Sequence, residues 1–168
     1  MKKLFIGLVI LGLAFTSYAQ ETTTEKLSEV VIAATNYKYL NKVGLTNASI
    51  PVAMLEQKVA NFDLKSADFY HDEYDLYHVS FYIPEGKILA AYNKDGEIIR
   101  TVERFKDVTL PKSVVKSVVN RFPGWTFAKD VYLVNYHEKR GVTKKYIITL
   151  ENGDKRIKVK TDEVGVFL

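Results

Sequence analysis

The chain has 168 residues, with 24 Lys and Arg against 20 Asp and Glu, 12% aromatic residues and no cysteine. The lack of cysteine excludes disulfides, thiol catalysis, cysteine zinc sites and a lipid-modified N-terminal cysteine. Removal of residues 1–19 as a targeting segment would leave 22 basic and 20 acidic residues, and a net charge of +2 is too small to indicate a nucleic-acid-binding protein.

Residues 1–19 have the pattern of a signal peptide. Two lysines precede an apolar run from Leu4 to Phe15, and Ser17 and Ala19 are small residues at the positions that a signal peptidase reads. The run of 12 residues is shorter than the roughly 20 that a transmembrane helix needs. We therefore expect cleavage before Gln20, a periplasmic or secreted protein, and no stable membrane insertion after cleavage. The alternative is an uncleaved membrane anchor.

Residues 20–48 are expected to form an N-terminal extended segment. Val30–Ala34 is a short apolar run that fits either a strand of the sheet or an extended docking segment. The sequence Leu-Ser-Glu-Val-Val-Ile within residues 27–40 is similar to segments by which exported or outer-membrane proteins engage periplasmic energy-coupling partners. No role follows from the sequence for Asn36–Leu40.

The domain is expected over residues 49–168 and begins with a helix. Apolar residues recur at steps of three and four over residues 52–62, and the members of this stripe are Val52, Leu55, Val59 and Phe62. Apolar and polar residues then alternate over 77–83, which is typical of a half-buried strand. Further strands are expected over 87–92 and 97–105, after turns at Pro84-Glu85-Gly86 and Lys94-Asp95-Gly96.

A second helix and three more strands follow. Pro111 suits the first helical position, and Pro123-Gly124 ends the helix. The core-facing side chains are expected to be Val114, Val115, Val118, Val119 and Phe122. Strands are expected over 125–137, 144–151 and 154–160.

The last hairpin has a predicted register. Asn152-Gly153 favours a two-residue type I′ turn, which pairs Glu151 with Asp154. In this register Ile148 lies opposite Ile157 and Tyr146 opposite Val159 on one face.

The order of elements predicts an α+β fold, an antiparallel β-meander sheet with helices packed on one face. A helix followed by a meander occurs twice, which indicates tandem half-repeats over about 49–107 and 108–168. The alternative is an ordinary α+β meander without duplication.

The second half carries a family resemblance. Phe122-Pro123-Gly124-Trp125, followed by the Tyr-Ile-Ile-Thr-Leu-Glu-Asn-Gly run of 146–153, resembles the PepSY-like domain family, which is related to the β-lactamase-inhibitor-like fold. The resemblance covers roughly residues 50–168 and is strongest over 108–160. It implies an exported α+β module that binds or inhibits a partner, with no catalytic residues to carry over.

The sequence contains no recognisable catalytic or metal-binding constellation. The three histidines lie in no known catalytic motif, and every glycine of the predicted domain stands alone in a turn. His71-Asp72-Glu73 with His78 could ligate a metal, but neighbouring strand residues point to opposite faces. The carboxylates Glu97, Glu103 and Asp130 are expected to be solvated at strand ends. The sequence thus predicts no enzyme, no cofactor and no metal, unless an enzyme uses an unusual site.

A sheet face rich in tyrosine is the expected binding surface, because tyrosine combines a large apolar ring with a hydroxyl. The candidate residues are His78 and Tyr82 on the polar phase of 77–83, Tyr132 and Tyr136 on the fourth strand, and Arg156 and Lys158 in a basic stripe with Lys160. The alternatives are ordinary cross-strand packing for the tyrosines and a solvated edge for the basic stripe.

These observations predict an exported, non-enzymatic binding module that recognises a protein or peptide of the cell envelope through a sheet face. Such a module could act as an inhibitor of the protein that it binds. The alternative is a structural envelope-accessory protein that docks to a larger complex through residues 27–40. Neither hypothesis involves nucleic acid.

Overall fold

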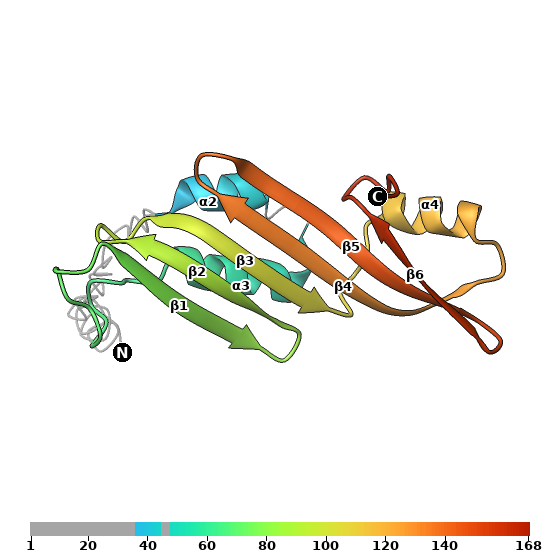
Figure 1. The fold of residues 1–168 in the computed structure, drawn as a ribbon, viewed down its shortest axis with the longest axis horizontal. Helices are drawn as coiled ribbons and strands as arrows, with labels where there is room; N and C mark the ends of the chain where they lie inside the picture. The colour runs from blue at the N-terminus through green and yellow to red at the C-terminus, as the bar shows by residue number, and fades with distance from the viewer. Residues whose placement is uncertain (1–35, 45–47) are drawn as a thin grey trace, which may run out of the picture. The chain divides into compact units, whose positions relative to one another are not determined.

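The computed structural model describes residues 36–44 and 48–168, which are drawn in colour in Figure 1. The predicted signal peptide and the apolar run Val30–Ala34 lie outside these residues. Within the two described ranges, no helix has the length and apolar character that a membrane span requires.

The described residues form three helices and six strands. The helices are α2 (Tyr37–Val43), α3 (Ile50–Ala60) and α4 (Lys112–Arg121). The strands are β1 (Leu76–Ile83), β2 (Gly86–Asn93), β3 (Ile98–Lys106), β4 (Thr126–His137), β5 (Gly141–Asn152) and β6 (Lys155–Thr161). Each strand pairs antiparallel with the next one in the chain, in the order β1-β2-β3-β4-β5-β6. The predicted meander is confirmed.

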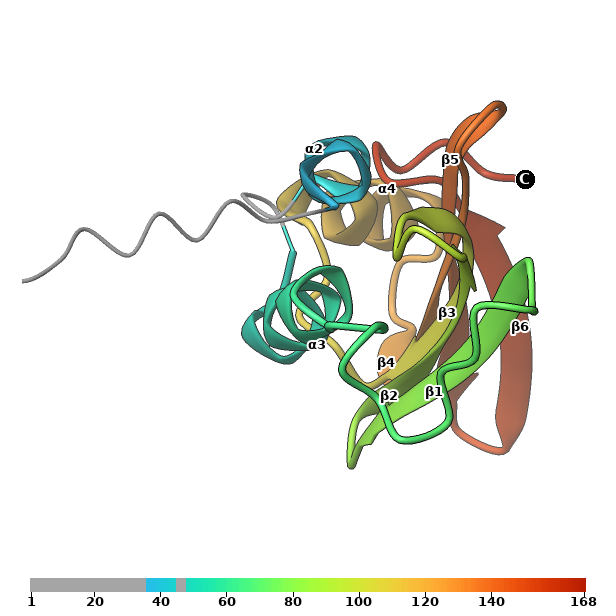
Figure 2. The same ribbon diagram turned by 90° about the vertical axis from the view of Figure 1, so that its left-hand side faces the viewer.

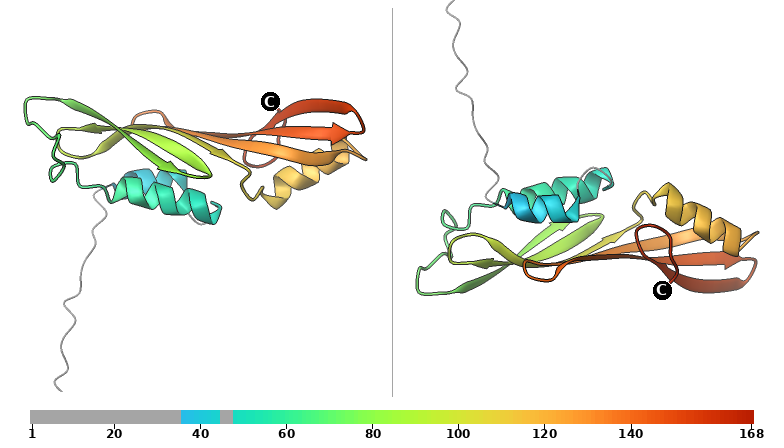
Figure 3. Two further views of the ribbon diagram at one scale, coloured as in Figure 1. Left: turned by 90° about the horizontal axis from the view of Figure 1, so that it is seen from below. Right: turned by 90° about the horizontal axis from the view of Figure 1, so that it is seen from above.

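All three helices lie on the same face of the sheet, which we call the inner face (Figures 2 and 3). Helix α3 packs on β1 and β2, and α2 packs on α3, β4 and β5. The core lies between the helices and the inner face, where Val59, Ile88, Phe105 and Ile148 are fully buried. The opposite, outer face is covered by none of the described helices, so the predicted α+β class with helices on one face is confirmed.

Strand β1 shows why the sheet has two different faces. Tyr77 and Phe81 are buried, whereas His78, Ser80 and Tyr82 are exposed. Successive side chains of a strand point to opposite faces, so this alternation places the polar set on the outer face, as predicted.

The two long helices differ from the prediction in detail. Helix α3 starts at Ile50 and ends at Ala60, two residues earlier than predicted at each end, and it buries the expected Val52, Leu55 and Val59. Pro111 caps α4 instead of occupying its first turn.

The apolar face of α4 is narrower than predicted. Val114 and Val118 are buried, but Val115 is 36% and Val119 50% exposed. Adjacent helical residues are rotated by about 100° around the axis. Two valines four residues apart can therefore face the core, while their neighbours turn toward solvent.

Residues 36–44 differ from the extended chain that the sequence predicted. Tyr37–Val43 is a helix that ends at Gly44, whose φ of 68° is left-handed. Tyr39 and Val43 are each 1% exposed and belong to the core. A seven-residue helix is too short to be stable alone, so α2 depends on packing that its own sequence does not reveal.

The predicted register of the last hairpin is wrong by two residues. Asn152 pairs with Lys155 and Glu151 with Arg156, so the turn consists of Gly153 and Asp154. Gly153 takes a φ of 55° at the first turn position, where glycine is favoured. The shift places Glu151 against Arg156 and avoids the predicted Glu151–Asp154 like-charge pair. A shift of two leaves every side chain on its predicted face.

Candidate functional site

Four of the six predicted binding residues lie on the outer face and are exposed. His78 and Tyr82 come from β1, and Tyr82 is 66% exposed. Arg156 and Lys158 come from β6 at the opposite edge of the sheet. The four residues therefore share one face but form no single cluster.

Tyr132 and Tyr136 are not on this face, which corrects their prediction as contact residues. They are 6% and 3% exposed and belong to the inner core. The Tyr132 ring stacks on Tyr146 at 4.6 Å between centroids, and the Tyr136 ring meets the edge of Tyr39 at 5.3 Å. Both phases of β4 are apolar, so the sequence did not reveal which phase the helices cover.

The outer face is strongly basic. Nine of its outward-facing side chains are Lys or Arg, and within the six strands the only acidic residue among the outward positions is Glu151. The nine are Lys87, Arg100, Arg104, Lys106, Lys129, Lys145, Arg156, Lys158 and Lys160. From Gln20 onward, the rest of the chain has 13 basic and 19 acidic residues. A nearly neutral protein thus has its positive charge concentrated on the face that the helices leave open.

Strand pairing arranges this face in rows that cross the sheet. One row, the cation row, consists of Tyr82, Lys87, Arg104, Leu133 and Lys145 on β1 to β5. The next row, the central row, has no charged residue and consists of Ser80, Leu89, Val102, Asn135 and Thr143. Leu89 is 42% and Val102 38% exposed, side by side on paired strands. Arg100 and two histidines, His78 and His137, lie in the row beyond it.

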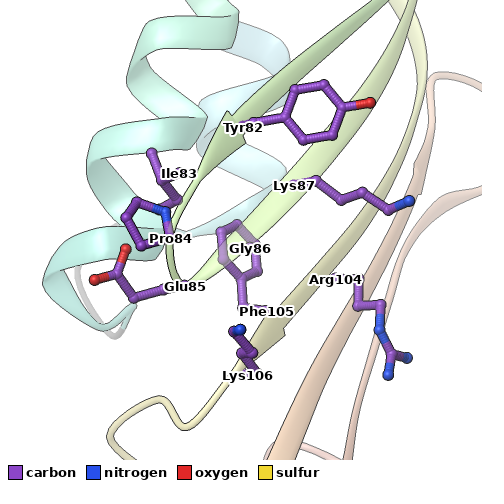
Figure 4. A pocket seen from close by; sticks show the side chains of 9 residues that line it. All are labelled: Tyr82, Ile83, Pro84, Glu85, Gly86, Lys87, Arg104, Phe105 and Lys106. Atoms are coloured by element: carbon purple, nitrogen blue, oxygen red, sulfur yellow. The ribbon is translucent and has the colours of Figure 1, made fainter.

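The cation row borders an open pocket of about 260 Å³ beside the β1–β2 turn (Figure 4). Tyr82, Lys87 and Arg104 point to one side of the ribbon there. Gly86 allows the close approach of β2 and β3, because a Cβ atom at this position would lie 2.5 Å from the Arg104 carbonyl oxygen. The residues that line the pocket include one exposed aromatic ring, Tyr82, and one carboxylate, Glu85. They also include the three cations Lys87, Arg104 and Lys106, so the net charge of the lining favours a ligand with negative charge.

A second cluster lies inside the protein and was missed from the sequence. Glu103 on β3 and Glu56 on α3 are each 1% exposed, whereas the sequence predicted a solvated Glu103. The Tyr39 hydroxyl donates to Glu103 Oε1 at 2.7 Å, and the Thr101 hydroxyl donates to the same oxygen at 2.6 Å. Lys144 on β5 is the nearby cation, and its Nζ lies 3.0 Å from Glu163 Oε2.

The two buried carboxyl groups are not both ionised at neutral pH. Burial and the adjacent Glu103 raise the pKa of Glu56 to about 9. Burial also raises the pKa of Glu103, although hydrogen bonds from Thr101 and Tyr39 oppose this shift. Protonated Glu56 can therefore donate a hydrogen bond to Glu103. The pair is buried, and the hydrogen bond from Tyr39 to Glu103 joins α2 to β3.

The histidines and carboxylates considered as metal ligands in the sequence do not form a metal site in the described residues. His71, Asp72, Glu73 and His78 are all exposed. Across residues 36–44 and 48–168, no group of three or more His, Cys, Asp and Glu side chains could hold a metal ion.

The proposed docking segment 27–40 is only partly described. Asn36 and Tyr39 are buried in the core, so these two side chains are not available to a partner in this fold. Residues 27–35 lie outside the described part of the chain.

Comparisons with known proteins do not assign a family. No protein-family model and no curated protein matches the chain. A solved structure of a BLIP-like protein from Bacteroides fragilis matches with a TM-score of 0.33 and 13% sequence identity. The match covers 56% of this chain and 66% of that protein. A TM-score this low does not establish a common fold, and the resemblance to PepSY-like domains stays a prediction.

Proposed function

We propose that this chain is an exported, non-enzymatic binding module that recognises a protein partner through the outer face of its sheet. The observation that carries the proposal is the concentration of nine cationic side chains, together with exposed Tyr82, Leu89 and Val102, on the face opposite the helices. Export rests on the signal-peptide pattern of residues 1–19.

The arrangement of the outer face resembles that of a protein interface. Such interfaces combine an apolar centre with a polar rim and are enriched in tyrosine and arginine. Here the uncharged central row lies between the cation row and the row of Arg100. We also propose that the two halves, about 49–107 and 108–168, are copies of one helix-and-meander unit. The order of elements supports this, because α3-β1-β2-β3 is followed by α4-β4-β5-β6.

The test is the capture of a partner from cell-envelope extract by tagged protein. Tyr82→Ala removes the most exposed aromatic ring of the outer face, and we expect partner recovery to fall about tenfold, as for an interface residue that contributes about 1.4 kcal/mol. Tyr37→Ala is the matched control, because Tyr37 is 58% exposed on α2. Equal capture by the parent and Tyr82→Ala would contradict recognition through this face.

The alternative function, docking through residues 27–40, makes a different prediction. Deletion of residues 20–35 spares Asn36 and all described elements. Loss of the partner in this deletion, with full capture by Tyr82→Ala, would favour the envelope-accessory hypothesis.

A further inference from the structure

We infer that the partner presents an acidic, extended peptide segment, and that the Tyr82, Lys87 and Arg104 end of the cation row anchors its carboxylates. This inference rests on the proposed function, since it names the chemistry of the partner that the outer face would bind. Three observations on the outer face lead to it.

The first observation is a like-charge pair near the open end of the β2–β3 hairpin. Lys87 and Arg104 are directly opposite each other on β2 and β3, and both are exposed. Like charges in such a pair destabilise a sheet. An anionic group bound between them would relieve this repulsion, so the arrangement is unfavourable in the free protein and favourable in a complex with an anion.

The second observation is the adjacent aromatic ring. Tyr82 on β1 pairs with Lys87 on β2, and Lys87 pairs with Arg104 on β3. The tyrosine ring, the lysine ammonium group and the arginine guanidinium group therefore follow one another across three strands. The three side chains border the pocket of about 260 Å³ (Figure 4). Arginine binds carboxylates with two parallel hydrogen bonds, and the tyrosine ring can pack on the aliphatic part of a Glu side chain.

The third observation is the spacing of the cations, which favours a peptide over a lipid surface. Along β3 the outward residues are Arg100, Val102, Arg104 and Lys106. Alternate residues of a strand are about 6.7 Å apart, which is also the spacing of alternate side chains in an extended peptide. A peptide with Asp or Glu at alternate positions can therefore follow β3, with an apolar residue over Val102 and Leu89. Leu89 and Val102 are 42% and 38% exposed, so they offer this apolar residue a contact surface.

The experiment uses fluorescent poly-L-glutamate as the probe, with anisotropy as the readout. We expect the parent protein to bind at low salt and to lose affinity steeply as salt is added. Lys87→Glu is expected to weaken binding about tenfold, whereas Lys116→Glu, the same charge change on exposed α4, should leave binding within about twofold because α4 lies on the other side of the sheet. Thermal unfolding should show Lys87→Glu at least as stable as the parent, because the new carboxylate lies opposite Arg104.

Several outcomes would overturn the inference. Equal weakening by Lys87→Glu and Lys116→Glu would show that only net charge matters. Binding to phosphatidylglycerol vesicles without binding to poly-L-glutamate would assign the face to lipid. Self-association that Lys87→Glu abolishes would assign it to a second copy of this chain. If poly-L-glutamate does not bind but Tyr82→Ala still loses the captured partner, the acidic partner is wrong while the proposed sheet-face function stands.

Discussion

Glu56 is the residue at which the chemistry of this fold is most unusual. It lies on α3 and faces Tyr39 from α2, Glu103 from β3 and Lys144 from β5. Its pKa rises from an ordinary 4.5 to about 9 because burial and Glu103 both disfavour its ionised form. Folding thus requires Glu56 to take up a proton at any pH between these two values.

This uptake determines how stability depends on pH. Between about pH 4.5 and 9, Glu56 binds more protons in the folded protein than in the unfolded chain. The contribution of Glu56 to stability is therefore greatest below pH 4.5 and is lost as the pH rises toward 9. Glu56→Gln keeps a hydrogen-bond donor toward Glu103 and removes the titrating proton. We expect this variant to be more stable than the parent at pH 8 by about 1–3 kcal/mol, with little difference at pH 4.5. Urea unfolding at several pH values measures this difference in the free energy of unfolding. If the stability of the variant changed with pH as that of the parent does, Glu56 would not be the group that causes the pH dependence.

A buried side-chain amide, that of Asn36, lies at the start of the short helix α2. The Asn36 side chain donates to the carbonyl oxygens of Ala60 at 3.3 Å and Gly96 at 3.1 Å, and it accepts from the Ile98 amide at 2.7 Å. It thereby joins α2 to the end of α3 and to the turn between β2 and β3.

Asn36→Ala would leave these backbone groups buried without their partner. We expect a loss of about 2–4 kcal/mol in the free energy of unfolding, measured by chemical denaturation. Asn41→Ala, at an exposed position of the same helix, should change stability by less than about 0.5 kcal/mol. A small effect of Asn36→Ala, equal to that of the control, would show that α2 is held by apolar packing alone.

An element could be predicted from the sequence where its buried positions are apolar and its exposed positions are polar. In β1 a strict alternation made both faces evident. In β4 the residues Val131 and Leu133 are as apolar as Tyr132 and Val134, so only the pairing with β3 and β5 and the cover of α2 decide which set is buried. Glu103 was predicted to be solvated because carboxylates are rarely buried; its partners Tyr39 and Glu56 are distant in sequence.

The candidate site was predictable only in part for the same reason. His78, Tyr82, Arg156 and Lys158 follow from alternation within single strands, and the structure places them outward. The cation row, in contrast, needs the register of five strands. Arg100, Arg104 and Lys106 already alternate with buried residues in the sequence of β3, which is the signal that could have indicated a basic face.

At the scale of the whole molecule, the separation of charge is the central feature. The outward strand positions hold nine cations against one carboxylate, while the rest of the chain from Gln20 onward has six more acidic than basic residues. A protein with a small net charge can then attract an acidic partner to one face and repel it from the others, which favours a single binding orientation.

Lysine acetylation, read out by mass spectrometry with and without the captured partner, tests the role of this face most directly. Our account predicts that the partner protects outer-face lysines, among them Lys87, Lys106 and Lys145, several-fold. Lys58 on α3 and Lys116 on α4 are exposed on the helical side and should react at an unchanged rate. Protection of Lys58 and Lys116, with the outer-face lysines still reactive, would contradict recognition through the sheet.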